Sequence, residues 1–476
     1  MGVVHGFIGR QRELARLHRW LGKTAAGGAI GRPGRALLLR GRRRVGKSRL
    51  VEEFVERSGV PHLFFTASGR PMGEELRLFA AEAAASTLPG ASLFDSVTLE
   101  SWEAAMRLLA AALPQDGPGI VVLDELPYLI AGDPGFEGTL QKVFDRELSR
   151  MPVLLIGIGS DLSMMEALND YGRPFHQRAT EMVLSALDPA DVGEMLGLGA
   201  ADAFDAYLVS GGLPLICDEW PSGASLWDYL AEAVTDPTSA LVVSGERSLA
   251  GEFPPEAQSR VVLNAIGTGQ RTFGSIGRAA AGVSHATLSR ALQLLLEKRL
   301  VTAELPLSSR PSRETRYHVA DVHLRFWLAF IWPGLPEIER GRGDRVLHRI
   351  RASWTSWRGL AIEPTVRESL RRMPEGTLPT GTNAVGGYWT RTNDPEIDLV
   401  GGDREPISKK ITMVGSVKWL EDRPFDSHDL AELVVHRAKL PGADSGVPMF
   451  AVSRSGSATS GVTVVGPEEL LHAWRS

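Results

Sequence analysis

The chain has 476 residues, 43% hydrophobic and 23% charged, which is enough for about three globular domains with buried cores. Its net charge of −5 provides no overall basic field, so any nucleic-acid contact has to come from a local patch. A single cysteine, Cys217, excludes a disulfide framework and a cysteine-rich zinc site. Without a long apolar run or a signal-peptide core, we expect a cytoplasmic protein with no membrane partner.

Residues 36–55 predict a strand, a phosphate-binding loop and a helix. The loop GRRRVGKS fits the pattern G-x4-G-K-[ST], whose backbone N–H groups face phosphates. We expect Lys47 to reach the β- and γ-phosphates of ATP and Ser48 to bind Mg²⁺. A simple glycine turn before a helix is the alternative, which the flanking strand and helix disfavour. The predicted nucleotide-binding residues here are Gly41, Arg42, Arg43, Arg44, Val45, Gly46, Lys47, Ser48 and Arg49.

Four further apolar runs predict strands that continue the same sheet, at 62–67, 119–126, 152–160 and 180–187. Nearly continuous apolar strands are typical of a parallel sheet covered on both faces. Asp124, at the end of the second run, is placed to hold the Mg²⁺ shell, and Glu125 to polarise the attacking water. Their alternative role is a helix cap. We expect Ser160 to reach the same edge and contact water or the γ-phosphate, with a turn or a helix cap as its alternative role.

The segments FIGRQRELARL, GRRRVGKS, VVLDELPYL, GIGSDLSMME, YGRPFHQRATEMVLSALDP and YLVSGGLPLI resemble, in this order, the archaeal-type ATPase family, which is related to AAA+ and STAND proteins. This resemblance covers most of the chain. It implies an α/β P-loop ATPase core of the ASCE type with strand order 5-1-4-3-2, followed by a helical lid at 188–250.

The resemblance also implies further contacts to the nucleotide. One wall of the adenine pocket is expected from Phe7, Ile8, Gly9 and Arg10. Arg173 or Arg178 is expected as a finger or sensor arginine on phosphate. An arginine after the fourth strand can equally be a surface residue or an ion-pair partner.

Residues 251–335 predict a winged helix-turn-helix, because three short helices precede two strands joined by the polar loop SSRPSRET. Ser284 is expected to cap the third helix. In a DNA complex, His285, Thr287 and Arg290 would face the major groove, with Arg310 and Arg313 near phosphates. The alternative is that this module packs as a lid or binds protein.

The aromatic segment 321–333 resembles the linker helix of the same family, for which we expect a core or docking role. The arginine-rich stretch after it predicts a helix with a solvated basic face, rather than one that follows a phosphate backbone.

Residues 336–476 resemble the PD-(D/E)xK restriction-endonuclease-like α/β domain of this family. Such sites need carboxylates to hold Mg²⁺ and a lysine to stabilise charge. The matching residues are Glu363, Asp398 and Lys418, with Glu396 as a further carboxylate. Ser416 stands where the family has an acid, and a hydroxyl is a weaker ligand for a hard cation. We therefore expect a degenerate site in which Asp398 and Lys418 form an ion pair, or a domain that binds nucleic acid without cutting it.

The sequence thus predicts a P-loop ATPase core at 1–187, a lid at 188–250, a winged helix at 251–335 and a nuclease-like domain at 336–476. Its expected activity is ATP hydrolysis with Mg²⁺, used as a regulatory switch. The alternatives are an ATP-controlled, Mg²⁺-dependent nuclease and a DNA-binding regulator that uses ATP only as a ligand. DNA, a protein partner and an oligomer all remain open as partners beside ATP and ADP.

Overall fold

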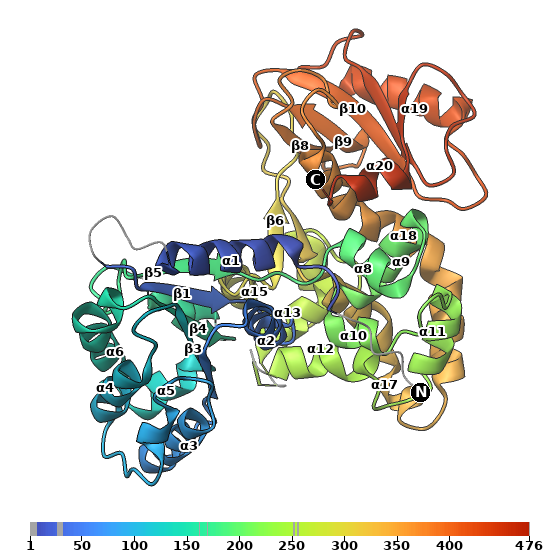
Figure 1. Ribbon diagram of the computed structural model, residues 1–476. Coiled ribbons are helices and arrows are strands. Elements are labelled where there is room, and N and C mark those ends of the chain that lie inside the picture. Colours follow the sequence, from blue (N-terminus) through green and yellow to red (C-terminus); the bar gives the residue numbers. More distant parts are fainter. Residues whose placement is uncertain are drawn as a thin grey trace. The chain divides into compact units, whose positions relative to one another are not determined.

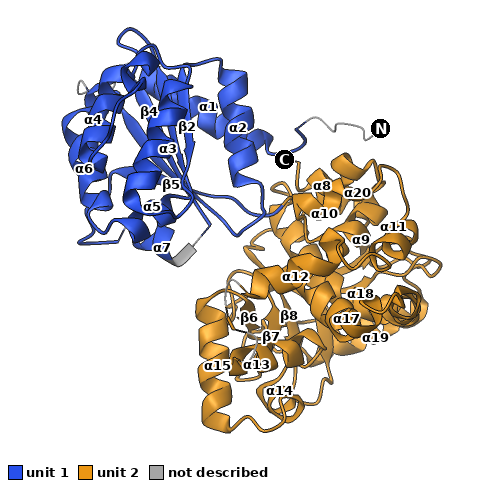
Figure 2. Ribbon diagram, turned by 90° about the horizontal axis from the view of Figure 1, so that it is seen from below, with its two compact units in different colours: residues 1–186 blue, residues 187–476 orange. Residues whose placement is uncertain are grey.

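A computed structural model describes residues 7–25, 32–160, 162–168, 170–250, 253–254 and 257–475. The chain divides into two compact units, residues 1–186 and 187–476 (Figure 2). The predicted ATPase core, residues 1–187, ends within one residue of the boundary between the units, and its extent as a domain stays a prediction. The predicted lid, winged helix and nuclease-like segment all belong to the second unit, and their separation into domains stays a prediction. None of the described helices is long and apolar enough to cross a membrane.

The first unit is built on a five-stranded parallel sheet with the order β2-β3-β4-β1-β5. Read from its other edge, this is the predicted order 5-1-4-3-2, so the predicted fold class is confirmed. The strands are β1 (Arg35–Arg40), β2 (His62–Thr66), β3 (Gly119–Asp124), β4 (Val153–Gly159) and β5 (Ala179–Val183).

Helices cover both faces of this sheet, because alternate strand residues point to opposite sides (Figure 1). Leu37 and Leu39 of β1 pack with α1 and α2, whereas Leu38 belongs to the core formed by α3 to α6. The helical segments of this unit are α1 (Gln11–Ala25), α2 (Lys47–Ser58), α3 (Met72–Ala84), η1 (Ala91–Phe94), α4 (Trp102–Ala112), α5 (Leu126–Gly132), α6 (Phe136–Arg146), η2 (Leu148–Arg150) and α7 (Leu162–Ala167).

The second unit begins with helices that share one hydrophobic core with the predicted winged-helix segment. The aromatic segment predicted to dock or form core is buried there: Trp327 is fully buried, and its Nε1 donates to the carbonyl of Val242 at 2.7 Å. These elements are α8 (Pro189–Leu196), α9 (Ala200–Ser210), α10 (Pro214–Asp218), α11 (Leu226–Ala233), α12 (Ala240–Ala250), α16 (Val322–Phe326), the π-helical η3 (Trp327–Ile331) and α17 (Trp332–Ile338).

Three helices followed by a two-stranded antiparallel hairpin occupy the segment predicted as a winged helix. Ser284 caps the third helix, as expected, because its Oγ accepts a hydrogen bond from Thr287 N at 3.2 Å. Of the predicted start of this segment, residues 251, 252, 255 and 256 lie outside the described residues. The elements are α13 (Gln258–Gly267), α14 (Phe273–Ala279), α15 (His285–Glu297), β6 (Val301–Glu304) and β7 (Arg316–Val319).

The C-terminal part holds a mixed five-stranded sheet with the order β12-β11-β10-β9-β8. β8, β9 and β10 pair antiparallel, and β10, β11 and β12 pair parallel. One face packs on α18, α20 and α9, and the other contacts α19. The elements are α18 (Gly343–Arg372), β8 (Ala384–Trp389), β9 (Glu396–Gly402), β10 (Ile411–Lys418), α19 (Ser427–Lys439), β11 (Met449–Ser453), β12 (Thr463–Val465) and α20 (Pro467–His472).

Only part of the basic helix α18 has the predicted solvated basic face. Arg345, Arg349 and Arg351 in its first half are exposed, as a solvated basic face requires. Arg358 and Arg367 are instead buried. Two buried guanidinium groups on one helix need acceptors inside the protein, and carboxylates provide them, as described below.

Candidate functional site

The phosphate-binding loop joins β1 to α2 in the first unit, as its motif predicts. Gly46 is the N-cap of α2 in a left-handed conformation, with φ 86°, which glycine adopts without a steric penalty. At Gly41, a Cβ would lie 2.4 Å from the carbonyl oxygen of Leu184, so the loop packs directly on the backbone after β5. The two glycines therefore fix the curvature that aims the start of α2 at a bound anion.

Lys47 lies inside the loop, with 7% of its surface exposed. Its Nζ donates to the carbonyl oxygens of Gly41 and Arg42, both at 2.9 Å. Burial lowers the pKa of Lys47, while the carboxylates of Glu125 and Asp124 oppose that shift. The ammonium group is therefore held at the centre of the loop, where a phosphate oxygen would replace a carbonyl as acceptor.

Ser48 and Asp124 meet although they come from α2 and the end of β3. The Ser48 Oγ donates to Asp124 Oδ2 at 2.7 Å, and the backbone N–H of Glu125 donates to Asp124 Oδ1 at 2.8 Å. Mg²⁺ prefers oxygen ligands and often takes only one or two from the protein, with water and phosphate supplying the rest. This hydroxyl and carboxylate pair fits such an ion.

Glu125 begins α5 in a left-handed conformation, with φ 52°, which is uncommon for a residue other than glycine. Its carboxylate accepts from the Ser160 Oγ, at 3.2 Å to Oε1 and 3.1 Å to Oε2. Ser160 follows β4, which lies between β3 and β1 in the sheet. The structure thus gathers Lys47, Ser48, Asp124, Glu125 and Ser160 at one edge of the sheet.

Arg10 ties the segment before α1 to the loop. It is buried and donates to the carbonyl oxygens of Val45 at 3.1 Å and Ser185 at 2.6 Å. Gly9, before it, has φ 73° and is buried. Phe7 and Ile8 are half-buried. The role of this segment as an adenine wall stays a prediction.

The remaining arginines of the predicted site differ in their surroundings. Arg43 and Arg49 are exposed, whereas Arg42 and Arg44 are half-buried. Arg173 forms an ion pair with Glu137 at 2.6 Å, and Arg178 binds both carboxylate oxygens of Asp145, at 3.0 and 2.9 Å. Glu137 and Asp145 both lie on α6. An ion-pair role is therefore present for both arginines, and their contact with phosphate stays a prediction.

In the second unit, three of the four predicted nuclease-like residues lie together. Asp398 Oδ2 accepts from the Ser416 Oγ at 3.0 Å and from the backbone N–H of Val417 at 2.8 Å. Burial, together with the charge of Asp398, raises the pKa of Glu363 to about 7. Burial also raises the pKa of Asp398.

Lys418 is held by a different acid from the one expected. Its Nζ lies 3.0 Å from Oδ1 of Asp429, on α19, and that same oxygen accepts from Arg423 at 2.7 Å. The expected ion pair with Asp398 is therefore not among its contacts. Glu396 forms an ion pair with Arg316 at 2.7 Å.

Arg367 is the residue that sequence reasoning missed. Its guanidinium donates to Glu363 Oε2 at 2.9 Å, to the carbonyl oxygen of Asp398 at 2.9 Å and to Glu304 at 3.2 Å. No three His, Cys, Asp or Glu side chains are grouped to hold a metal in the part of the chain that the structure describes. One carboxylate oxygen of Glu363 is therefore paired with this guanidinium, and the degenerate character of the predicted Mg²⁺ site stays a prediction. The spacing of Glu363 and Arg367, four apart on a helix, is the signal that predicts their pairing.

Comparisons with known proteins found one family model and one relative of the full chain. The family model DUF234, described as archaea bacterial proteins of unknown function, matches residues 327–430. An uncharacterized protein of Methanocaldococcus jannaschii is 27% identical over 463 residues, covering 94% of this chain and 95% of its own. The relative spans nearly the whole chain, whereas the family model matches only part of the second unit.

Solved structures with a similar fold were also found. The Walker-type ATPase PABY2304 of Pyrococcus abyssi has a TM-score of 0.47 at 20% identity, covering 68% of this chain and 96% of its own. The ORC2 protein of Aeropyrum pernix has a TM-score of 0.42 at 14% identity, covering 73% and 97%. These similarities concern the fold alone.

Proposed function

We propose that the protein binds ATP at the loop of its first unit and hydrolyses it slowly, as a nucleotide-driven switch. The observation that carries this proposal is the arrangement of Ser48, Asp124, Glu125 and Ser160 around the loop. A loop that only recognised phosphate would not need an oriented second carboxylate beside the metal-holding one.

Each group of the nucleotide site has its own role in this proposal. The loop N–H groups and Lys47 bind the phosphate oxygens, and Ser48 with Asp124 holds Mg²⁺. When bound there, Mg²⁺ would supply positive charge that offsets the charge developing on the phosphates. Glu125 accepts a hydrogen bond from the attacking water, which forms a bond to the γ-phosphorus while the bond to the ADP oxygen breaks. Ser160 donates to the Glu125 carboxylate and so keeps it pointed at that water.

ATP turnover by wild type, Glu125→Gln and Glu52→Gln tests this assignment. Glu52 is a matched control because it is half exposed on α2. We expect Glu125→Gln to lower turnover about a hundredfold or more while ATP binding persists, and Glu52→Gln to behave as wild type. Equal turnover in wild type and Glu125→Gln, or no ATP binding at all, would overturn the proposal.

We propose that the second unit provides the output of the switch and that its C-terminal part does not cut DNA. The support is that Arg367 engages Glu363 and the backbone of Asp398, while Lys418 engages Asp429. With Mg²⁺ and duplex or single-stranded DNA, we expect no cleavage products from wild type. Cleavage that disappears in Asp398→Ala would show that the nuclease reading is right.

DNA binding without cutting is the second candidate for that output. It is favoured by the exposure of His285 and Arg290 on α15 and of Arg310 and Arg313 in the loop between β6 and β7. The test is binding to a DNA duplex at low and high salt. Salt-sensitive binding that weakens in Arg290→Gln supports DNA as the partner, and no binding leaves a protein contact as the output.

A further inference from the structure

The second unit contains a cavity of about 360 Å³ that the functions above leave without a role. Its walls come from α13, β7, α16, η3 and α18, together with the turn after α13. Ser353 and Ser356 on α18 line it and are exposed, so it is open to solvent along that helix. Ligand-binding cavities in proteins commonly measure about 300–1,000 Å³, so this one has room for a small organic molecule.

Arg271 lines the cavity, and its guanidinium N–H groups are available to a ligand. Across the residues that the structure describes, its guanidinium has no hydrogen bond or ion pair. Burial lowers the pKa of Arg271, while the charges of Glu363 and Glu396 oppose that shift. Both carboxylates already accept from other arginines, Glu363 from Arg367 and Glu396 from Arg316. A partly buried guanidinium whose N–H donors are unpaired is well suited to bind an anionic group.

A second guanidinium also lines the cavity. Arg325, on α16, donates to the carbonyl oxygens of Val319 at 2.9 Å and Ala361 at 3.1 Å, while its Nε is buried with no partner. Burial lowers the pKa of Arg325, the charge of Arg271 adds to that shift, and the charges of Glu304 and Asp321 oppose it. Two like charges in one cavity destabilise each other, and an anion between them would relieve that repulsion.

The remaining walls suit a flat apolar group. Phe330 and Trp357 line the cavity, with ring centroids 5.4 Å apart and planes inclined by 66°. His318 lines it as well, and its neutral ring supplies one hydrogen-bond donor and one acceptor. The cavity therefore combines a charged end with an aromatic side.

We propose that this cavity binds a small organic anion. Its carboxylate, sulfonate or phosphate group would accept from Arg271 in the field of Arg325, and its planar apolar part would pack on Phe330 and Trp357. All of its lining residues belong to the second unit, and none is a residue of the nucleotide loop. A ligand bound there would act on the second unit directly. This proposal does not depend on ATP hydrolysis at the loop.

The test is calorimetric titration of the full-length protein with 1-naphthalenesulfonate and with the neutral 1-naphthalenemethanol. We expect one equivalent of the sulfonate to bind, and the alcohol to bind more weakly. Arg271→Gln should weaken sulfonate binding about tenfold or more, because one charge-assisted contact is lost. Arg278→Gln is the matched control, since Arg278 is exposed on α14, and it should bind as wild type.

A second variant covers the case in which Arg271→Gln fails to fold. Ser356→Phe places a ring at the open rim, on an exposed helix position, and should also abolish binding. The proposal is overturned if wild type shows no saturable binding, or if a folded Arg271→Gln or Ser356→Phe variant binds the sulfonate as wild type does. Equal affinity for the neutral alcohol would equally overturn it.

Discussion

The protonation of His318 is decided by its neighbours. It lies on β7, half-buried, and its pKa is lowered from 6.5 to about 2. Glu304 lies 3.6 Å from its Nε2 but does not offset the opposing effects. These are burial first, followed by the positive charges of Arg271, Arg325, Arg367 and Arg316. His318 is therefore neutral at physiological pH, and the contact with Glu304 is not an ion pair.

This lowered pKa predicts a loss of stability in acid. Between pH 6.5 and about 2 the unfolded chain binds a proton at His318 that the folded chain does not, so stability falls as pH drops below 6.5. The loss reaches about 2 kcal/mol at pH 5, at about 1.4 kcal/mol per pH unit. His318→Gln should remove this part of the pH dependence, as measured by urea unfolding at pH 7.5 and 5.

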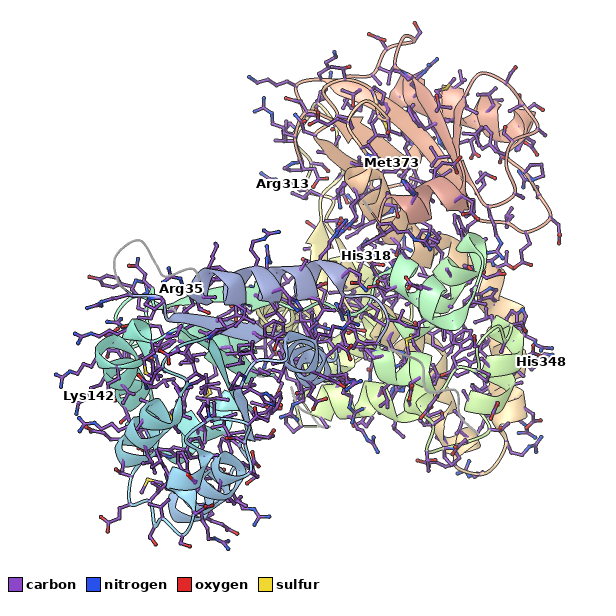
Figure 3. The ribbon with its side chains drawn as sticks, in the orientation of Figure 1. Arg35, Lys142, Arg313, His318, His348 and Met373 are labelled. Carbon is purple, nitrogen blue, oxygen red and sulfur yellow. The ribbon has the colours of Figure 1, made fainter. Side chains whose placement is uncertain are left out.

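His348 provides the control for that experiment, because it is exposed on α18 (Figure 3). His348→Gln should keep the pH dependence of wild type. If His318→Gln keeps it as well, His318 is not the buried neutral group described above.

At the scale of elements, Asp205 joins parts of the second unit that are far apart in the chain. Its carboxylate accepts from Arg358 on α18 at 2.7 Å, from Arg454 after β11 at 2.8 Å and from Trp419 after β10 at 3.1 Å. Burial raises the pKa of Asp205, and the two arginines oppose that shift. One acid on α9 thus holds the C-terminal sheet and α18 against the helices that precede them.

Removing this acid should destabilise the second unit strongly. Among the described residues, Asp205→Ala leaves the buried Arg358 with the half-exposed Glu421 as its one carboxylate partner, which we expect to cost about 3–5 kcal/mol of unfolding free energy. Asp202→Ala is the control, because Asp202 is 64% exposed in its ion pair with Arg454, and it should cost less than about 1 kcal/mol. Urea unfolding checks both, and equal effects would contradict the role of Asp205.

At the scale of the whole molecule, each unit has its own hydrophobic cores. Those of the first unit surround its parallel sheet, and those of the second surround its helices and its mixed sheet. Separate cores allow the two units to unfold in separate steps. The nucleotide loop belongs to the first unit alone.

A nucleotide should therefore stabilise one of two thermal transitions. At about 100 times its Kd, ADP with Mg²⁺ adds about 2.7 kcal/mol to the unit that binds it. Differential scanning calorimetry should show the transition of the first unit moving to higher temperature while that of the second stays in place. Lys47→Ala should abolish the shift. A single transition that moves as a whole would mean that the two units unfold cooperatively.

The sequence by itself determined the fold of the first unit and the central residues of its candidate site. The loop motif spans eight consecutive residues, and β1 to β4 are nearly contiguous apolar runs, so short-range pattern is enough to identify them. The meeting of Ser48, Asp124, Glu125 and Ser160 followed from one rule, that the carboxyl ends of parallel strands share an edge of the sheet.

Only the tertiary structure decided which charges pair in the second unit. Lys418 engages Asp429 on α19, and Arg367 engages Glu363 and the backbone of Asp398, although the motif predicts a lysine beside Asp398. Arg271 and Arg325 come together from elements that are 54 positions apart in the chain. The partner of a buried charge depends on distances of a few ångströms and on access to water, and both arise only when distant segments pack.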